Sequence, residues 1–266
     1  MIGWRNCMIK LVALDMDGTL LNSRNEIPED FFPWVKSHPH IRTVIASGRQ
    51  YQTLCDNMSE IKHELTIIAE NGGFVFCKGE MIYSDPMTPD HVKQILDWTA
   101  RKPGLVPIVC GAKSAYISRN AKKHIVEEAS IYFHELKTCE HLFREATEDV
   151  IVKVAVYVES LKAEENMPYM EQLEGNLSVV LSGDRWIDVA NATVCKGNAI
   201  KAIQEKYNIS FEESMCFGDY LNDVTLIKSC GESYCMANGH PQLKELAKYI
   251  TTSNDERGVM RVLEKL

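Results

Sequence analysis

The sequence lacks the features that mark nucleic-acid-binding, secreted or membrane-spanning proteins. Lys and Arg form no basic run, and the formal net charge of −8 argues against a surface that binds nucleic acid. No apolar run approaches the roughly 20 residues that a membrane span requires, and no segment resembles a signal peptide. The nine cysteines include no Cys-x-x-Cys pair. We therefore expect reduced thiols in a cytoplasmic protein with no nucleic-acid or membrane partner.

Three common catalytic or nucleotide-binding motifs are also missing. The sequence holds no Gly-x-Ser-x-Gly elbow, no Walker A sequence and no Gly-x-Gly-x-x-Gly, which excludes the sites that these motifs build. It has no internal repeat and no low-complexity tract. Its 266 residues, 45% of them hydrophobic, are enough for one large domain or two smaller ones. Residues 1–7 match no recognisable element, and Met8 is an alternative start to Met1.

Apolar strands alternate with helical stretches in the first and last parts of the chain. Each predicted strand is short and is followed by Gly or polar residues, which is typical of buried strands in a parallel sheet. The strands are 9–14, 43–46, 65–69 and 215–217, and the helical patterns are 51–61, 196–207 and 223–229. This alternation indicates βαβ units. It predicts an α/β fold with a doubly wound, Rossmann-like parallel sheet.

The middle of the chain predicts a separate module inserted into this sheet. A Pro-containing linker at residues 84–89 leads into a helix for which Thr88 can serve as the N-cap. Strand candidates follow at 105–109, 115–118, 151–158 and 177–181, with a helical pattern at 162–174. We therefore expect a core domain at residues 1–84 and 188–266 and an inserted α+β domain at residues 85–187. The linker also suggests that the inserted domain opens and closes.

The first predicted strand ends in two carboxylates, Asp15 and Asp17. Open α/β sheets bind ligands at the carboxyl ends of their strands, so this pair lies at a functional edge. At a separation of about 5 Å and an effective dielectric near 20, the two charges repel by roughly 3 kcal/mol. Such a pair shifts a pKa or recruits a cation, and carboxylate oxygens favour Mg²⁺. A simple Asx turn is the alternative. A calcium loop fails because Leu20 stands where an EF-hand needs Gly.

A second cluster of polar residues follows the strand at 215–217. It consists of Asp219, Asn222 and Asp223. Because parallel strands end at the same edge of a sheet, these residues and the first pair suggest one metal site. The alternative for Asp223 is a simple N-cap, since Asp is common where a strand meets a helix.

Two more segments predict an anion site at the same edge. Ser47, Gly48 and Arg49 offer a hydroxyl, a small backbone and a guanidinium where a strand meets a helix N-terminus. Lys196 begins another predicted helix and can bring an ammonium there. The alternatives are a simple Ser cap and a solvated Lys.

These four segments, taken in order, resemble the motifs of the haloacid dehalogenase (HAD) superfamily of phosphohydrolases. They are Asp-x-Asp-Gly-Thr at 15–19, Ser-Gly-Arg at 47–49, Lys-Gly at 196–197 and Gly-Asp-x-x-Asn-Asp at 218–223. The insertion between the second and third is similar in position and size to the type IIB cap of the Cof-type subgroup. Segments 70–73, 236–239 and 252–259 are similar to recurrent segments of that subgroup. The resemblance implies a HAD core with an inserted cap that selects the substrate.

The resemblance also implies a role for each candidate residue. Asp15 would be the nucleophile that forms an aspartyl phosphate, and Asp17 would be the general acid and base. Mg²⁺ would be the cofactor, held or oriented by Asp15, the Asp17 main chain, Asp219 and Asp223. The phosphoryl oxygens would be bound by Ser47, Gly48, Lys196 and Asn222. Arg49 would lie either behind the groups that touch the phosphoryl oxygens or near the leaving group.

The implied activity is that of a Mg²⁺-dependent phosphatase acting on a small phosphorylated metabolite such as a sugar phosphate. Asp17 favours C–O–P chemistry, because dehalogenase-like members lack this second Asp and phosphonatase-like members resemble a pattern with Ala there. The alternatives are a sugar phosphomutase and a regulator that binds phosphorylated metabolites without turnover. A regulator would need neither Asp15 nor Asp17. The sequence makes no prediction about the oligomeric state.

The cap region offers weaker candidates. Residues 119–120 and 183–186 are candidates for contacting the substrate, although Trp186 is of a type that more often belongs to a core. Four other cap residues invite a zinc interpretation: His124, His134, Cys139 and His141. Their spacing fits no structural zinc site, so we expect surface residues.

Overall fold

The computed structural model of the chain describes residues 8–170, 172–173 and 175–266. Contacts divide these residues into two units, which we describe separately. Unit 1 comprises the described residues up to Gly48, Asn57–Tyr83 and Cys195–Leu266, and unit 2 comprises Arg49–Asp56 and the described part of Ser84–Val194. No helix within the described ranges is long and apolar enough to cross a membrane.

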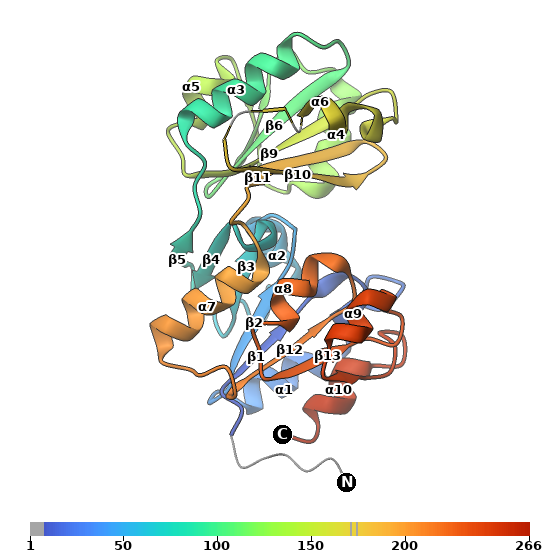
Figure 1. Cartoon of the computed structure of the whole chain (residues 1–266). Helices are drawn as coiled ribbons and strands as arrows, with labels where there is room; N and C mark the ends of the chain where they lie inside the picture. Colours follow the sequence, from blue (N-terminus) through green and yellow to red (C-terminus); the bar gives the residue numbers. More distant parts are fainter. Residues whose placement is uncertain (1–7, 171, 174) are drawn as a thin grey trace. The chain divides into compact units, whose positions relative to one another are not determined.

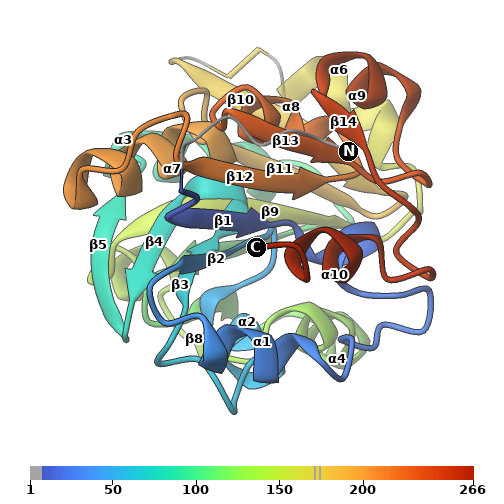
Figure 2. The same cartoon turned by 90° about the horizontal axis from the view of Figure 1, so that it is seen from below.

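Unit 1 contains an eight-stranded sheet (Figures 1 and 2). In spatial order its strands are β14 (Tyr249–Ile250), β13 (Glu232–Cys235), β12 (Ser214–Gly218), β1 (Leu11–Leu14), β2 (Arg42–Ala46), β3 (Thr66–Ala69), β4 (Phe74–Cys77) and β5 (Glu80–Ser84). The strands from β14 to β3 pair in parallel, whereas β4 is antiparallel to β3. Only the short turn η2 (Glu70–Gly72) joins β3 to β4, and a parallel neighbour would need a long crossover. The predicted α/β fold is confirmed, with a mixed sheet instead of a wholly parallel one.

Helices cover both faces of this sheet, which is why its central strands are apolar on both sides. Leu11 and Ala13 of β1 share a buried cluster with residues of α7 (Lys196–Tyr207), α8 (Val224–Ile227) and α9 (Pro241–Leu246). Val12 and Leu14 point to the opposite face, because side chains alternate along a strand. Figure 2 shows α1 (Phe31–Ser37) and α10 (Gly258–Leu263) on that side.

Unit 2 contains a six-stranded sheet of its own (Figure 1). In spatial order its strands are β10 (Leu177–Gly183), β11 (Trp186–Asn191), β9 (Ile151–Val158), β6 (Leu105–Gly111), β7 (Ala115–Ser118) and β8 (Leu136–Cys139). Neighbours are antiparallel except for β7 and β8. Val154 and Val156 of β9 cluster with residues of α3 (Pro89–Ala100), whereas Ala155 and Tyr157 cluster with residues of α4 (Lys123–Tyr132). Because these residues alternate along β9, the two helices lie on opposite faces.

The boundary between the units differs from the predicted one. Residue 188, where we expected the core to resume, lies within β11, and β11 pairs with β9 from Trp186 to Ala190. The contacts divide the chain after Val194. Residues Arg49–Asp56 also group with unit 2, since the Gln50 side chain donates to the Glu135 carbonyl and accepts from its N–H.

Two helices are shorter than predicted. The helix expected at 51–61 ends as α2 (Tyr51–Asn57), and i→i+3 turns at Met58 and Ile61 follow it. The helix expected at 162–174 is a 3₁₀ turn, η3 (Ala163–Asn166), and a single turn of α-helix, α6 (Met167–Met170). Pro168 explains the break, because it lacks the N–H that a continuous helix would need there. Residues 171 and 174 of the expected helix lie outside the described residues.

Candidate active site

The central strand of unit 1 positions the predicted nucleophile. The Asp15 N–H continues the β1 ladder by donating to the Phe217 carbonyl at 3.1 Å. The chain then closes into the turn η1 (Met16–Leu20), in which the Leu20 N–H donates to the Asp15 carbonyl at 3.2 Å. Asp15 is 5% exposed, whereas Asp17 within the turn is exposed. One carboxylate is therefore buried at the end of β1, and the other is exposed to solvent.

Gly18 lets this turn approach the second acidic cluster. Its φ is +76°, and a Cβ at this position would lie 2.3 Å from Asp219 Oδ2. Thr19 Oγ1 donates to Asp219 Oδ1 at 3.2 Å. A larger residue at position 18 would push Asp219 away, so glycine is required where the segments after β1 and β12 meet.

Three carboxylates and one ammonium gather at the carboxyl ends of β1 and β12. One oxygen each of Asp15, Asp219 and Asp223 lies within 4.8 Å of the others. Lys196, the first residue of α7, places Nζ 2.5 Å from Asp15 Oδ1 and 2.6 Å from Asp223 Oδ1. The side chains of Lys196 and Asp223 are 0% exposed. Among the residues that the structure describes, no other group of His, Cys, Asp and Glu is arranged to share a metal ion.

Asp223 does two things in this arrangement. Its Oδ2 accepts the backbone N–H groups of Asp219 at 3.0 Å and Tyr220 at 3.2 Å. It therefore stabilises the turn after β12 through residues that precede it. It is not a simple N-cap, because its side chain makes no cap hydrogen bond to α8. Its Oδ1 accepts from Lys196. One buried carboxylate thus fixes both the Asp219 backbone and the Lys196 ammonium.

Burial and mutual repulsion disfavour the ionised forms of Asp15 and Asp219 in this cluster. Desolvation, with the charge of Asp223, raises the pKa of Asp15 to about 8 against the opposing effect of Lys196. Desolvation and Asp223 also raise the pKa of Asp219 to about 6. Desolvation alone would lower the pKa of Lys196, but the charges of Asp15 and Asp223 reverse this and raise it. A divalent cation would relieve the repulsion, and a donor set made only of oxygens fits Mg²⁺.

Asn71 connects the Ser47 segment to Asn222. Ser47 follows β2 and is 1% exposed, and its carbonyl accepts the Asn71 N–H at 2.9 Å. A Cβ on Gly48 would lie 2.8 Å from Asn71 Nδ2. Asn222 Nδ2 donates to Asn71 Oδ1 at 3.2 Å. Asn71 was not among the predicted site residues, although an Asn-Gly pair directly after a buried strand marks a turn at the functional edge.

Arg49 and the cap candidates belong to unit 2, and their roles stay predictions. Arg119 and Arg185 each pair with a carboxylate of that unit. Trp186 is 9% exposed, which favours its interpretation as a core residue. Its ring contacts those of Tyr132, Phe133 and Tyr157.

The cap residues that invited a zinc interpretation have other partners. His124 lies 3.5 Å from Glu159, and His134 lies 2.7 Å from Asp56. Cys139 is buried. Within the described residues these side chains form no shared metal site.

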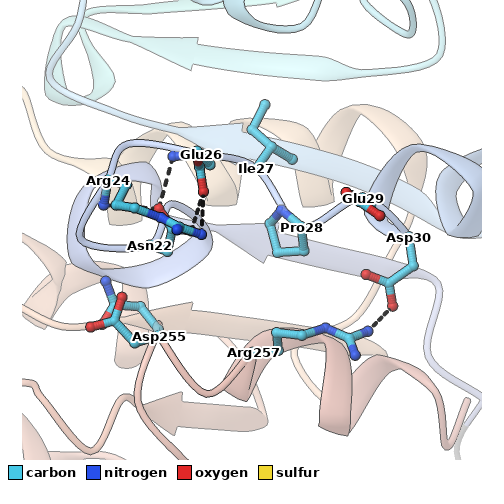
Figure 3. A pocket seen from close by; sticks show the side chains of 10 residues that line it. Asn22, Arg24, Glu26, Ile27, Pro28, Glu29, Asp30, Asp255 and Arg257 are labelled. Carbon is cyan, nitrogen blue, oxygen red and sulfur yellow. Dashed lines mark hydrogen bonds and ion pairs between the residues drawn. The ribbon is translucent and has the colours of Figure 1, made fainter.

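A charged pocket lies between residues 22–30 and the C-terminal segment of unit 1 (Figure 3). Its volume is about 440 Å³. Two ion pairs lie among the residues that line it. Arg257 pairs with Asp30 across the pocket, and Arg24 pairs with Glu26 within segment 22–30. Nearby, the Asn254 side chain donates to the Leu21 carbonyl at 2.8 Å. The Arg257 to Asp30 and Asn254 to Leu21 contacts join the chain that follows η1 to residues 254–257.

A sequence profile of the haloacid dehalogenase-like hydrolases matches residues 12–263. The chain belongs to this family. The family predicted from the four motifs is thereby confirmed. This HAD chain places the carboxylate and lysine motifs in one cluster, with Lys196 between Asp15 and Asp223.

Relatives of known description are similar over almost their whole length. The 5-amino-6-(5-phospho-D-ribitylamino)uracil phosphatase of Escherichia coli is 29% identical over 97% of this chain and 96% of its own. A putative phosphatase of Streptococcus pyogenes is 30% identical, over 97% of this chain and 98% of its own. Together with the family match, these likenesses make the protein a HAD-type phosphatase, a phosphoric monoester hydrolase.

Solved structures support the two-part architecture. A Streptococcus mutans protein superposes with a TM-score of 0.82 at 27% identity, over 97% of this chain and 98% of its own. A sugar phosphatase of HAD subclass IIB superposes with a TM-score of 0.77 at 21% identity, over 96% of this chain and 98% of its own. At 21% identity, the match to the sugar phosphatase shows a shared fold and nothing about the substrate. The Cof-type architecture, a HAD core with an inserted α+β cap, is that of this chain.

Proposed function

We propose that this phosphatase depends on Mg²⁺ and hydrolyses a small phosphorylated sugar or sugar alcohol through an aspartyl phosphate on Asp15. The observation that carries the proposal is the cluster at the end of β1, where Asp15, Asp219 and Asp223 share one site with the buried Lys196. A buried nucleophile beside a cation-binding set of oxygens is suited to phosphoryl transfer.

The two carboxylates of the first motif divide the chemistry. An oxygen of Asp15 attacks phosphorus, and the bond from phosphorus to the leaving oxygen breaks. Asp17 donates a proton to the leaving oxygen and later takes a proton from the water that hydrolyses the aspartyl phosphate. That second step releases phosphate and restores Asp15. The exposure of Asp17 supports its role, since it has to exchange protons in each cycle.

The surrounding groups would hold the phosphoryl oxygens. A positioned acid accounts for only about 10²–10⁴ of the acceleration, so positioning and electrostatics must supply most of the rest. We assign this to Lys196 and to donors from the Ser47–Gly48 segment and Asn222. Mg²⁺, when bound by Asp15, the Asp17 carbonyl and Asp219 with Asp223 behind them, would neutralise charge on the phosphoryl group.

The relatives support the substrate class. The Escherichia coli relative, and another from Bacillus subtilis at 26% identity, are named as phosphatases of a ribitylaminouracil phosphate. The phosphate in that compound is carried on a sugar alcohol. We therefore infer a polyhydroxylated phosphate monoester as the substrate of this chain.

We also propose a cytoplasmic location. The eight cysteines that the structure describes are free thiols, which is typical of a reducing compartment. The net charge of −8 is consistent with a small-molecule substrate in place of a nucleic-acid partner.

Phosphate release from a panel of sugar phosphates, ribityl phosphates, nucleotides and p-nitrophenyl phosphate tests the mechanism. We expect Mg²⁺-dependent release by the wild type, loss with EDTA, and a loss of at least about 10³-fold in Asp15→Asn, because the nucleophile is removed. Asp97→Asn is the matched control, because Asp97 pairs with Lys93 on the surface of α3. That variant should keep the wild-type rate.

Other outcomes would favour the alternatives. Turnover retained in Asp15→Asn would refute the aspartyl phosphate. Transfer of phosphate within a sugar without net release would indicate a mutase. Binding of panel members without either reaction would indicate a regulator.

A further inference from the structure

The loop between β3 and β4 has a costly backbone conformation. Glu70, Asn71 and Gly72 have φ values of +51°, +55° and +111°. Glycine adopts such angles freely and Asn tolerates them, but three in succession are unfavourable for a chain of L-residues. Backbone strain of this kind persists where neighbouring contacts enforce it, and it is concentrated at functional sites. The residues that this loop contacts therefore indicate which part of the site it supports.

The loop touches the segments that carry the proposed phosphoryl-binding groups. The Asn71 N–H donates to the Ser47 carbonyl, and the Asn71 amide occupies the space that a Cβ on Gly48 would need. Gly72 packs against the start of α7, where a Cβ would lie 2.3 Å from the Cys195 carbonyl oxygen and 3.0 Å from the Lys196 nitrogen. These residues all belong to unit 1. One loop thus sets the spacing between the Ser47–Gly48 backbone and Lys196.

The same loop also orients Asn222. The Asn222 side chain is exposed, and the terminal torsion of an Asn amide has broad minima. The hydrogen bond from Asn222 Nδ2 to Asn71 Oδ1, 3.2 Å long, joins residues 151 positions apart. This bond restricts an amide that would otherwise rotate.

We propose that Asn71 is a positioning residue of the phosphoryl-binding site, which fixes the Asn222 amide and the Ser47–Gly48 backbone. The inference rests on the proposed function, since that assigns phosphoryl binding to these groups. Asn71 acts through them and need not touch the substrate. Asn suits the task because its short amide accepts a hydrogen bond and tolerates the left-handed region.

Asn71→Gly removes the amide and leaves the backbone angle accessible. Asn208→Gly is the matched control, because Asn208 ends α7 with a φ of +53° and is exposed. We expect similar melting temperatures for the two variants. With p-nitrophenyl phosphate, kcat/KM should fall about 5-fold in Asn71→Gly, the effect of one hydrogen bond, and stay unchanged in Asn208→Gly. Equal kcat/KM in the two variants would overturn the proposal.

A double-mutant cycle tests whether Asn71 acts through Asn222. In the Asn222→Ala background, Asn71→Gly should lower kcat/KM by much less than 5-fold. The effects of two groups that act together are not additive. A full additional 5-fold loss would contradict action through Asn222.

Two measurements without turnover separate this proposal from the function on which it rests. Hydrogen exchange of the Asn222 side-chain amide, followed by NMR, should be faster in Asn71→Gly than in Asn208→Gly. Titration with inorganic phosphate should show weaker binding in Asn71→Gly. If both hold but the wild type releases no phosphate from any substrate, the proposed reaction fails and the positioning role stands. Unchanged exchange and unchanged phosphate affinity would overturn the positioning role, whatever the activity.

Discussion

At the scale of single residues, Lys196 controls the electrostatics of the site. Its ammonium is buried between Asp15 and Asp223. A buried ion pair adds little net stability by itself, but removing one partner leaves an uncompensated charge in a medium of low dielectric. Lys196 therefore compensates two carboxylates that the proposed chemistry needs and that folding alone would not favour.

We expect Lys196→Met to lower the free energy of unfolding in EDTA by about 3–5 kcal/mol, because two buried carboxylates lose their partner. Urea unfolding followed by circular dichroism measures this. Lys248→Met is the control, since Lys248 pairs with Glu232 at 2.6 Å but is 47% exposed, and its loss should be about 1 kcal/mol or less. Equal losses in the two variants would show that the Lys196 pairs are not energetically special.

The sequence predicted which residues to examine, but not how they pair. Asp15, Asp219 and Lys196 were recognisable because each follows an apolar strand or begins a helix. The Lys196 to Asp15 contact joins residues 181 positions apart, and it exists because α7, which begins at Lys196, packs on β1. Spacing along the chain does not reveal that neighbourhood. Segment 70–73 was noted, but Asn71 was not predicted as a site residue for the same reason, since its partner Asn222 comes from another segment.

At the scale of elements, the close contact between η2 and the start of α7 can be tested through the free energy of unfolding. Gly72 has a φ of +111° and lies against the Cys195 carbonyl. Gly79, in the turn between β4 and β5, has a φ of +86°, but a Cβ added there would meet nothing within 4 Å. The two glycines share the backbone requirement and differ in the contact.

We expect Gly72→Ala to lower the free energy of unfolding by about 2–5 kcal/mol, the sum of a left-handed alanine and an overpacked contact. Gly79→Ala should cost only about 1–2 kcal/mol, from the backbone alone. Chemical denaturation of both variants measures the difference. A Gly79→Ala loss as large as that of Gly72→Ala would mean that the contact with α7 contributes nothing.

The elements that the sequence predicted well are those whose burial is visible in their composition. β1, β2, β3 and β12 are apolar on both faces and end in Gly or polar residues, and their bounds were predicted within about two residues. β4, β5, β13 and β14 were missed. β4 and β13 have only four residues each. β14 has two residues, and β5 lies at the edge of the sheet and is partly exposed. Such strands are defined by pairing with a neighbour, which a local pattern does not encode.

At the scale of the whole molecule, each unit has the parts of an independent domain. Unit 2 has its own six-stranded sheet and buried clusters on both faces of β9. Every strand of that sheet comes from Ser84–Val194. The Arg49–Asp56 segment adds no strand to this sheet and contacts it through hydrogen bonds such as that from Thr53 to the Tyr132 carbonyl.

We expect a fragment of residues 84–194 to fold by itself and to melt cooperatively, because its core is complete. Circular dichroism and a thermal scan check this. A fragment of residues 84–183 is the control, since it lacks β11, the strand between β10 and β9, and should stay unfolded. A noncooperative, unfolded 84–194 fragment would show that unit 2 needs the rest of the chain.

The two ends of the insertion are fastened together, since the Asn191 side chain donates to Asp85 Oδ1 at 2.8 Å and to the Pro86 carbonyl at 3.0 Å. This has a consequence for folding kinetics. In an unfolded chain, bringing Tyr83 and Cys195 together means closing a loop of roughly 110 residues, whereas a folded insertion leaves an effective loop of roughly 10. The free-energy cost of loop closure, which is entropic, then falls by about 2 kcal/mol. Early folding of the insertion would therefore speed the pairing of β1 with β12. The cap would then act as a folding scaffold for the strand ends that carry the proposed catalytic site.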